Sequence, residues 1–599
     1  MRTARPDAEN RKSFLFTEPL HILSTDHPNE IPTIFASIDS ALRDGHYVAG
    51  FLSYEAGYHF EPAARRNLGP LRQCDLPLAW FGVYREPLTC DGSDRSWAAS
   101  GDHIIVEPGT FSIDISSAEY SERVQTIRRY IEAGDLYQAN LTMLLRQPWN
   151  GDAAGLFERI MENQPVPYGC LINTGQAHIL SASPELFFRK QGSKLLVRPM
   201  KGTSPRGRDF QEDCRKAAWL AADEKNRAEN VMIVDLLRND LGRICTAGSI
   251  EVSDLFAVER HPDLLQMTST VRGLLNPGTS SYEIFRSLFP CGSITGAPKI
   301  RTMQIIRQLE DQPRGIACGA IGYFSPGGDA TFSVAIRTLV VSGGEIQMRV
   351  GSGVTYDSNP EAEYAECLLK AKFVTRNLPR FELIETILWE NDFFLLDLHL
   401  ERLKASADYF EFQCDLEDVR AQLDRLAASF QPNSRRRVRM LLSRSGQLSI
   451  TDTPLAPAGI SASIVISTRR TDSSDAFLRH KTTYRATYDR AFADARAAGF
   501  DDVLFLNERE EVTECAIHNV MIEKNGRLVT PSLECGLLPG VYRRHLLATH
   551  PELEQAVITL EQVLSADRVF IFNSVQGMLP VRKIVTNNDL VRGSTRLRP

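Results

Sequence analysis

The chain has 599 residues, of which 43% are hydrophobic and 24% charged, a balance typical of globular protein and unlike disordered, collagen-like or coiled-coil chains. At roughly 100–200 residues per domain, this length predicts two large or three smaller units. The 68 basic and 75 acidic residues give a net charge of −7, and no basic stripe with interleaved aromatics favours nucleic-acid binding. No apolar run reaches the roughly 18 residues that span a bilayer, the first residues lack the apolar middle of a signal peptide, and the 11 scattered cysteines include no CxxC pair. We therefore expect a cytoplasmic protein with small-molecule substrates, no nucleic acid or membrane partner and no disulfide framework.

The first part of the chain mixes strand-like and helical patterns. Strand-like runs at 46–57 and 76–84 precede a predicted helix at 118–133, whose apolar residues follow the 3.6-residue period. Further strands are predicted at 177–189 and 194–202, and one long helix at 211–241.

Three successive strands are then predicted at 316–324, 331–341 and 345–354, joined by glycine-rich turns. Strands linked this way favour antiparallel pairing and an α+β class. Asn359-Pro360 is typical of a helix start, and this helix should end before Pro379. The pattern then restarts, which predicts one domain over residues 1–375 (an N-terminal region, 1–115, and a core, 116–375) and a second over 376–599.

Carboxylates are the first candidate site residues. Glu363 and Glu366 lie three apart on the predicted helix and share a face, after the small-residue run VGSGVTYDS. Glu229 precedes an apolar stretch in another helix. Such carboxylates, with oxygens from a substrate, could hold Mg2+. From spacing alone, solvated glutamates on helix surfaces are the favoured interpretation.

Six strings resemble the chorismate-utilising enzymes, in that family's order and over residues 10–375: RPMKGTSPRG, AENVMIVDLLRNDLGR, FPCGSITGAPKIRTMQII, GAIGYFSP, FSVAIRT and GSGVTYDSNPEAEYAECLLKAK. The resemblance implies two facing antiparallel sheets flanked by helices, with the site between them. It also implies that the Mg2+ ligands are Glu229 and Glu366, with Glu363 beside them. The residues implied to contact chorismate are Gly202, Thr203, Tyr323, Arg337, Gly351, Ser352 and Gly353.

Two positions indicate which branch of that family the chain resembles. Lys201 stands where anthranilate synthases carry a small residue and aminodeoxychorismate synthases carry lysine, which in the family's proposed mechanism attacks C2 of chorismate and expels the C4 hydroxyl. Gln138 stands where isochorismate synthases place a lysine that activates water, so ammonia is the expected nucleophile. Glu185 matches the carboxylate that handles the proton of the departing hydroxyl. Gln266 replaces a histidine found in some relatives, so no role of that histidine is transferred.

No glycine-elbow cysteine of a glutamine amidotransferase occurs in the sequence; Cys291 lies inside the chorismate motif instead. We therefore expect ammonia from solution or from a separate glutamine amidotransferase subunit.

Over roughly 380–590, the strings HLERLKASADYF, DDVLFLNEREEVTECAIHNVMI, CGLLPGVYRRHLL and FNSVQGMLPV resemble the fold-type IV pyridoxal-phosphate enzymes, aminodeoxychorismate lyase and its transaminase relatives among them. This implies an α/β domain in which Lys481 binds the cofactor aldehyde and moves the substrate proton, while Glu514 pairs with the pyridine nitrogen. Arg402, Gly540, Val541 and Ser574 are implied to hold the phosphate, and a homodimer through this domain is expected. Cys515 and His518 depart from the usual TEGAxSN string without removing a cofactor ligand.

Together the two resemblances imply that chorismate and ammonia become aminodeoxychorismate, and then 4-aminobenzoate and pyruvate for folate synthesis, with Mg2+ and pyridoxal phosphate as cofactors. The alternative is an aminodeoxychorismate synthase fused to a branched-chain or D-amino-acid transaminase. A degenerate half that only binds ligand is disfavoured by intact Lys201, Glu229, Arg337, Glu366, Lys481 and Glu514.

Overall fold

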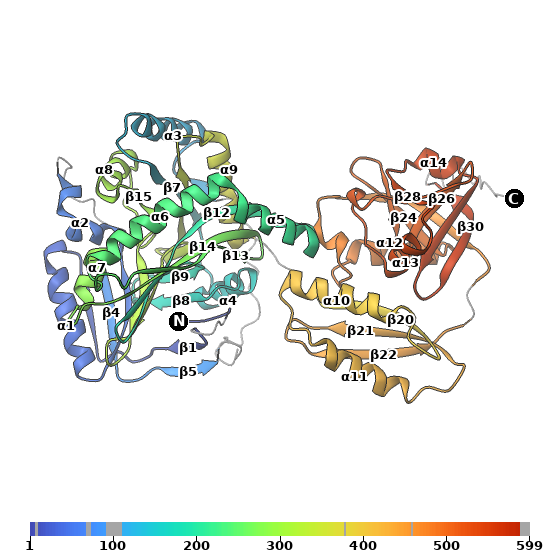
Figure 1. The fold of residues 1–599 in the computed structure, drawn as a ribbon, viewed down its shortest axis with the longest axis horizontal. Coiled ribbons are helices and arrows are strands. Elements are labelled where there is room, and N and C mark those ends of the chain that lie inside the picture. The colour runs from blue at the N-terminus through green and yellow to red at the C-terminus, as the bar shows by residue number, and fades with distance from the viewer. Residues whose placement is uncertain (6–9, 67–73, 92–110, 376–378, 457–458, 587–599) are drawn as a thin grey trace. The chain divides into compact units, whose positions relative to one another are not determined.

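Two antiparallel sheets dominate the first part of the chain (Figure 1). The computed structural model describes residues 1–5, 10–66, 74–91, 111–375, 379–456 and 459–586. The chain divides into two units: Met1–Pro205 with Ala217–Leu378, and Arg206–Lys216 with Pro379–Pro599. The boundary expected after residue 375 meets residues 376–378, which lie outside the described ranges.

The larger sheet of the first unit has the order β12-β14-β11-β10-β17-β16-β3-β4-β2, with β13 beside β14. Its strands are β2 (His21–Thr25), β3 (Tyr47–Leu52), β4 (Ala79–Tyr84), β10 (Leu186–Gln191), β11 (Lys194–Arg198), β12 (Met200–Pro205), β13 (Glu251–Arg260), β14 (Leu264–Leu274), β16 (Ala320–Phe324) and β17 (Ala330–Val334).

The smaller sheet has the order β15-β7-β19-β18-β9-β8, with β6 beside β7. Its strands are β6 (Ser112–Ile113), β7 (Gln138–Pro148), β8 (Tyr168–Asn173), β9 (His178–Ser183), β15 (Gly296–Ala297), β18 (Thr338–Ser342) and β19 (Glu345–Val354). The short strands β1 (Lys12–Leu15) and β5 (Leu88–Asp91) pair separately.

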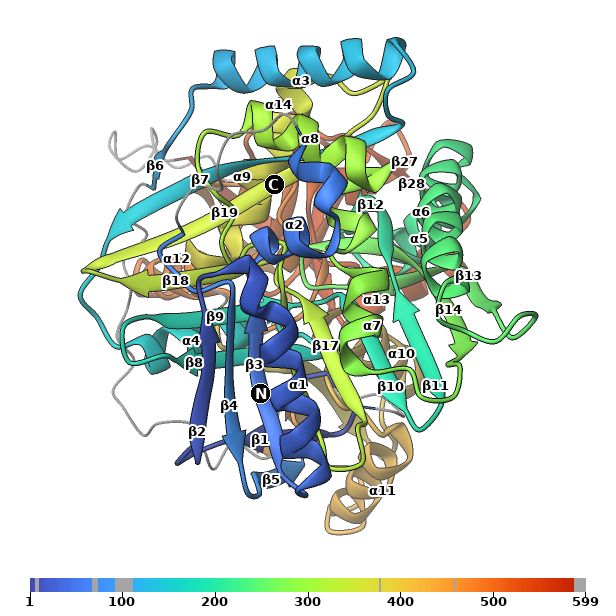
Figure 2. The ribbon, with the colours of Figure 1, turned by 90° about the vertical axis from the view of Figure 1, so that its left-hand side faces the viewer.

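Helices cover the outer faces of both sheets. Figure 2 shows α1 in front of β3 and β4, where its buried apolar residues join the larger sheet's core. The smaller sheet is covered by α3, α4, α8 and α9. The helices of this unit are α1 (Ile31–Arg43), α2 (Gly57–Phe60), α3 (Ser117–Glu132), α4 (Ala153–Asn163), α5 (Phe210–Ala222, which runs across the unit division), α6 (Glu224–Gly242), α7 (Ser281–Leu288), α8 (Lys299–Leu309) and α9 (Pro360–Thr375).

The two sheets pack against each other through a shared apolar cluster. Phe51 and Trp80 of the larger sheet lie in one buried cluster with Ile172 and Ile179 of the smaller. This confirms the expected α+β class with two antiparallel sheets flanked by helices.

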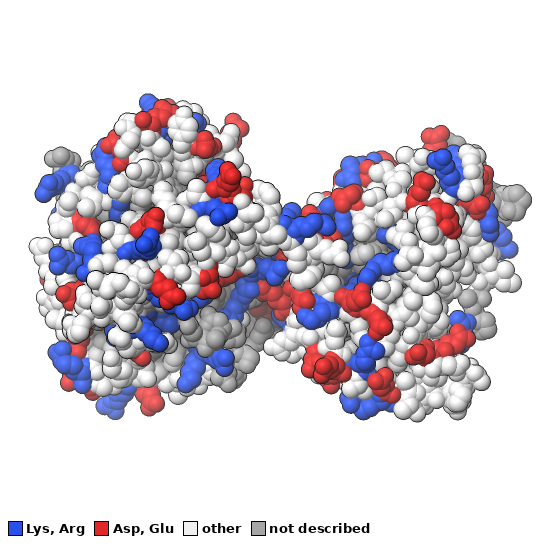
Figure 3. Space-filling model, in the orientation of Figure 1, with Lys and Arg blue, Asp and Glu red and all other residues white. Residues whose placement is uncertain are grey.

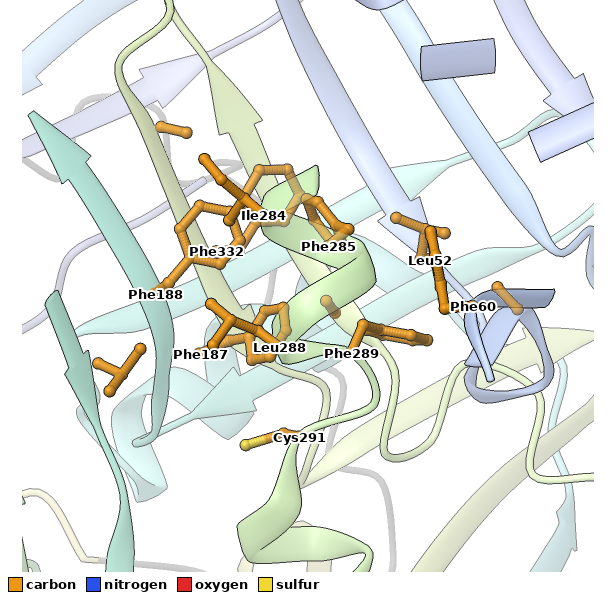
Figure 4. Packing of buried hydrophobic residues seen from close by; sticks show 14 of the residues in the cluster. Leu52, Phe60, Phe187, Phe188, Ile284, Phe285, Leu288, Phe289, Cys291 and Phe332 are labelled. Carbon is orange, nitrogen blue, oxygen red and sulfur yellow. The ribbon is translucent and has the colours of Figure 1, made fainter. Parts of the chain in front are cut away.

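An aromatic core joins α7 to the larger sheet (Figure 4). Phe285 lies 5.1 Å from Phe332 and 5.3 Å from Phe188, both in near-perpendicular ring contacts. Because a buried phenylalanine stabilises by roughly 1.5–3 kcal/mol, this cluster holds α7 firmly on the sheet. The chain leaves the cluster at Cys291 and then reaches Ser293, which the candidate site uses.

Two predicted strands turn out to be four, because the chain changes sheets within them. The run 331–341 is β17 in the larger sheet and β18 in the smaller, separated by Ala335–Arg337. The run 177–189 likewise divides into β9 and β10 around Glu185. A continuous apolar run does not reveal such a switch, because its residues are buried in both sheets.

Two other predictions are corrected similarly. The run 194–202 is β11 and β12, and the expected helix 211–241 is α5 and α6, broken at Asp223. The Asp223 side chain accepts a hydrogen bond from the Asn226 amide and caps α6, a typical role for aspartate at a helix start.

The second unit contains a three-stranded antiparallel sheet and a mixed sheet. The first consists of β20 (Leu383–Glu390), β21 (Arg435–Leu442) and β22 (Leu448–Pro454), packed on α10 (Leu396–Phe410) and α11 (Leu416–Ala427). The mixed sheet has the order β25-β24-β23-β30-β29-β26-β27-β28 and packs on α12 (Ala486–Ala497), α13 (Val541–Thr549) and α14 (Leu560–Ser565). Its strands are β23 (Ala462–Thr471), β24 (Asp502–Asn507), β25 (Val512–Cys515), β26 (Asn519–Lys524), β27 (Arg527–Pro531), β28 (Leu553–Ala556), β29 (Arg568–Asn573) and β30 (Gly577–Val585).

Acidic and basic side chains are interspersed on the face drawn in Figure 3. Among the described helices, none combines the length and apolar character needed to cross a membrane.

Candidate functional site

Lys201 lies in an irregular part of β12. The pairing of β12 with β14 shifts register between Met200 and Thr203, and Gly202 has a φ of +92°, which other residues rarely adopt. Gln266 on β14 donates to the Gly202 carbonyl at 2.9 Å and accepts from the Thr203 hydroxyl at 3.2 Å. Such irregularities are common beside active sites.

The Lys201 amine and the Glu185 carboxyl influence each other. Burial lowers the pKa of Lys201, opposed by Glu229 and Glu185. Burial raises the pKa of Glu185 to about 7, although the Ser293 hydroxyl donates to its carboxylate at 2.5 Å and Lys201 adds a positive charge nearby. A carboxyl that titrates near neutral pH can give or take a proton, and an amine with a lowered pKa is more often an uncharged nucleophile.

Three glutamates gather on the α6 and α9 side of Lys201. Burial raises the pKa of Glu229; the positive charges of Lys201 and Lys225 oppose this rise, and the negative charges of Glu363 and Glu366 add to it. Glu366 forms a 2.7 Å ion pair with Lys370, whose amine also donates to the Gly351 carbonyl at 2.9 Å. In the ranges that the structure describes, no group of three or more His, Cys, Asp or Glu is arranged to hold a metal ion.

These carboxylates nevertheless fit Mg2+ chemically. Glu229 is repelled by two neighbouring carboxylates, and a divalent cation among them would relieve that repulsion.

The glycine-rich end of β19 lies directly against Lys201. A Cβ added at Gly353 would lie 3.2 Å from Lys201 Nζ and 2.4 Å from Gln138 Nε2. Gln138 is buried, and its side-chain oxygen has no hydrogen-bond partner within the described parts of the chain. A polar ligand group is therefore the natural partner for Gln138.

Ser352 points away from this surface. It is fully buried, and its hydroxyl lies 2.9 Å from the Tyr120 hydroxyl. Adjacent strand residues face opposite sides, so only the backbone of Ser352 remains for a ligand.

Arg337 lies where the chain crosses from the larger to the smaller sheet, with a φ of +50°. This crossing is hydrogen-bonded to the one between β9 and β10. The Val334 amide donates to the Glu185 carbonyl at 3.0 Å, and the Ala182 amide donates to the Arg337 carbonyl at 3.0 Å. Burial lowers the pKa of Arg337 to about 10, and its guanidinium has no side-chain partner among the described residues. A half-buried guanidinium without a side-chain partner among the described residues suits a substrate carboxylate.

Tyr323 contacts residues other than those around Lys201. Its ring packs 4.9 Å from that of Phe14, and it lines a small cavity with Lys12 and Tyr168. Its assignment to the chorismate site remains a prediction.

In the second unit, Lys481 and Glu514 form the core of another candidate site. Burial and the charge of Arg402 lower the pKa of Lys481 to about 7. Burial raises the pKa of Glu514 to about 8, although it accepts from the Leu538 amide at 3.2 Å and from the Tyr488 hydroxyl at 3.4 Å. Glu514 lacks a cationic ion-pair partner among the described residues, so a protonated ring nitrogen would complete it.

The predicted phosphate ligands are also distributed around this unit. Arg402 donates to both Glu385 oxygens, at 2.8 and 2.7 Å, which fixes the orientation of its guanidinium. Gly540 precedes the helix that begins at Val541, and a Cβ at Gly540 would lie 2.0 Å from Asn519 Oδ1. Ser574 lies in the turn between β29 and β30.

This donor set fits pyridoxal phosphate. It offers a lysine with a lowered pKa for the aldehyde, a carboxyl for the ring nitrogen, and the start of a helix at Val541 for a phosphate.

Both departures from the usual string lie close in sequence to Glu514. Cys515 is buried on β25. His518 lies between acceptors, 2.7 Å from Asp502 and 2.6 Å from Gln576.

Two family models match separate parts of the chain. Residues 6–376 match the chorismate binding enzyme family. The chain belongs to that family. Residues 382–584 match amino-transferase class IV, so the chain combines a chorismate-utilising domain with a fold-type IV domain.

Relatives of the first domain carry two kinds of name. Aminodeoxychorismate synthase component 1 of Escherichia coli K12 is 36% identical over 351 residues, which are 55% of this chain and 76% of the relative. Anthranilate synthase component 1 1 of Haloarcula marismortui is 41% identical over 281 residues, 46% of this chain and 58% of the relative. The crystal structure of anthranilate synthase component I from Streptococcus pneumoniae TIGR4 matches with a TM-score of 0.55 at 26% identity, over 62% of this chain and 93% of that one.

Sequence reasoning missed three residues that the structure brings to these sites: Ser293, Lys370 and Glu385. Lys370 was detectable, because it lies four residues after Glu366 on one helix face. Ser293 and Glu385 carry no local signal, since their partners are far away in sequence.

Proposed function

We propose that the first domain converts chorismate and ammonia to 4-amino-4-deoxychorismate, and that the second converts this product to 4-aminobenzoate and pyruvate. The observation that carries the proposal is the lysine amine of Lys201, which lies among Glu185, Glu229 and the Gly353 backbone with a lowered pKa. Within the family that the chain resembles, the residue at this position distinguishes anthranilate synthases from aminodeoxychorismate synthases, which carry lysine here.

In the proposed first reaction, the uncharged Lys201 amine forms a bond to C2 of chorismate while the C4 hydroxyl leaves. Glu185 supplies the proton that lets the hydroxyl depart as water, for which a pKa of about 7 is suitable. Ammonia then forms a bond to C4, and the lysine leaves C2, so the amine is regenerated. Arg337 pairs with a substrate carboxylate throughout.

Glu229 and Glu366, with Glu363 nearby, would hold Mg2+, which supplies positive charge for a carboxylate of the substrate. Gln138 lacks a titratable group, which supports ammonia rather than activated water as the nucleophile.

In the second domain, pyridoxal phosphate supplies an electron sink when bound. Lys481 takes the proton at the amino-bearing carbon and returns one to the leaving enolpyruvyl group, because its pKa of about 7 allows both states near neutral pH. Glu514 would pair with the ring nitrogen, and Arg402 and the helix start at Gly540 and Val541 would hold the phosphate.

The relatives' shared name, component 1, supports a separate subunit that supplies ammonia. We propose a glutamine amidotransferase in that role, and a homodimer through the second domain.

The test is product analysis of the full-length protein with chorismate, Mg2+, pyridoxal phosphate and an ammonium salt. We expect 4-aminobenzoate and pyruvate in equal amounts. Lys201→Ala should lose this product by at least about 100-fold, as removal of a nucleophile does, whereas Lys194→Ala, at an exposed lysine on β11, should keep it.

Normal turnover of Lys201→Ala would contradict the nucleophile role. Accumulation of aminodeoxychorismate without pyruvate would instead favour a transaminase in the second domain.

A further inference from the structure

A segment from the first part of the chain is built into the second unit. Residues Arg206–Lys216 follow β12 directly, yet they cluster with Pro379–Pro599. A domain that began at Pro379 would lack them.

This segment forms a stack of side chains that ends next to Lys481. The Arg206 guanidinium lies 4.5 Å over the Tyr409 ring, and the His480 ring stacks on Tyr409 at 4.4 Å. Both groups cannot occupy one face of the ring, so Tyr409 lies between them. Arg206 also donates to the Tyr409 carbonyl at 2.8 Å, and the Tyr409 hydroxyl donates to the Gly207 carbonyl at 2.7 Å.

The stack is held in place by buried polar contacts. Asp213 is fully buried; it accepts from Arg206 Nε at 2.8 Å and from the Gly207 amide at 2.9 Å. On the other side, Ser406 Oγ lies 2.9 Å from His480 Nδ1. Burial lowers the pKa of His480 to about 3, so the ring is neutral beside the Arg206 charge.

The segment also binds Arg479, the residue before His480. Arg479 is 5% exposed, and its guanidinium donates to Asp209 at 3.0 Å. Arg208 forms a 2.7 Å ion pair with Glu534, which also lies 3.5 Å from Arg479. The two residues that precede Lys481 are thus fixed by residues 206–216.

The residues at and after Lys481 are fixed separately. The Ile384 amide donates to the Lys481 carbonyl at 2.8 Å, and Thr483 donates to the Glu382 carbonyl at 2.9 Å. Lys481 therefore lies between two sets of contacts. Residues 206–216 hold the residues before it, and β20 with the preceding Glu382 holds Lys481 itself and the residues after it.

We propose that Arg206–Lys216 is a positioning segment for Lys481, acting through Asp209 on Arg479 and through Arg206 and Tyr409 on His480. The proposal rests on the assignment of Lys481 to the cofactor. One stretch of chain thus carries the Lys201 nucleophile and, directly after it, holds the loop of the second lysine.

The test is Asp209→Asn in the full-length protein. Asparagine keeps the Oδ1 that accepts from the Glu212 amide but lacks the charge that holds Arg479. We expect the dissociation constant for pyridoxal phosphate, measured by absorbance titration of cofactor-free protein, to rise about three- to tenfold. Trypsin should also cleave after Arg479 faster than in the parent, and chorismate consumption should not change.

Asp397→Asn is the control, because it breaks another Asp–Arg pair of this unit. Asp397 lies 2.7 Å from Arg420, and both side chains are exposed, Asp397 to 80% and Arg420 to 49%. This variant should leave cofactor affinity and cleavage at Arg479 unchanged. Asp209→Asn combined with Arg479→Gln should weaken cofactor binding no more than Arg479→Gln alone, because both changes remove the same Asp209–Arg479 interaction.

Parental affinity and parental cleavage of Asp209→Asn would overturn the proposal. Full additivity of the two changes would overturn it as well. Failure of the proposed function is a different result: the parent would bind the cofactor but release no pyruvate from aminodeoxychorismate.

Discussion

Gly353→Ala tests whether the end of β19 forms the surface against which Lys201 works. The added Cβ would lie 2.4 Å from Gln138 Nε2 and 3.2 Å from Lys201 Nζ. A normal carbon–nitrogen contact is roughly 3.5 Å, so Gln138 must move by about 1 Å and Lys201 by a few tenths.

Such overpacking costs about 1–3 kcal/mol in a well-packed site. If the Lys201 amine is displaced, the same free energy is added to the activation barrier of chorismate amination. Since about 1.4 kcal/mol is tenfold in rate, kcat/KM for chorismate amination should fall about 10- to 100-fold.

The assay is formation of aminodeoxychorismate at saturating ammonia, with the melting temperature measured in parallel. Gly242→Ala is the control, because its nearest neighbour would be Ile250 Cδ1 at 3.8 Å, an ordinary contact. A second variant, Gly353→Ala with Gln138→Ala, should recover the melting temperature but only part of the rate.

Unchanged kcat/KM in Gly353→Ala would refute the placement of this glycine against the nucleophile. A rate fully restored by Gln138→Ala would show that the crowding acts on the glutamine alone.

Glu366→Gln should raise the Mg2+ concentration needed for half-maximal rate about tenfold, while Glu361→Gln, exposed on the same helix, should not; an equal Mg2+ requirement would remove Glu366 from the metal site. Glu514→Gln should stabilise the cofactor-free protein at pH 8 but not at pH 4. The carboxyl has a folded pKa of about 8 against an ordinary 4.5, so the native state holds its proton longer, and the stability it contributes falls as pH rises between these values, by on the order of 4–5 kcal/mol. Urea denaturation at several pH values measures this, and a pH-independent difference would contradict it. Lys481→Ala should consume chorismate at the parental rate yet accumulate aminodeoxychorismate, whereas Lys201→Ala should still release pyruvate from added aminodeoxychorismate; formation of 4-aminobenzoate by Lys481→Ala at the parental rate would contradict the lyase assignment.

Short strings such as PMKGT and TECAIHN identify the two families from the sequence alone, because they carry chemistry in their residue types. Lys201 could be selected this way, since a surface lysine is out of place between Pro-Met and Gly-Thr. Lys481 is implied only by the resemblance of the strings around it, because its own neighbours are equally typical of a solvated helix start. The α+β class also followed from local pattern, because strand and helix periods depend on neighbouring residues.

Only the tertiary structure decided which residues meet. The crossing at Arg337 divides an apolar run between two sheets, and alternation along β19 turns the Ser352 hydroxyl to the core. Ser293 reaches Glu185, and Asp209 reaches Arg479, across more than a hundred and more than two hundred residues respectively. Sequence periodicity records which face of an element is apolar but not which distant element covers it, so these contacts, and with them the pKa values of both lysines, are properties of the packed fold.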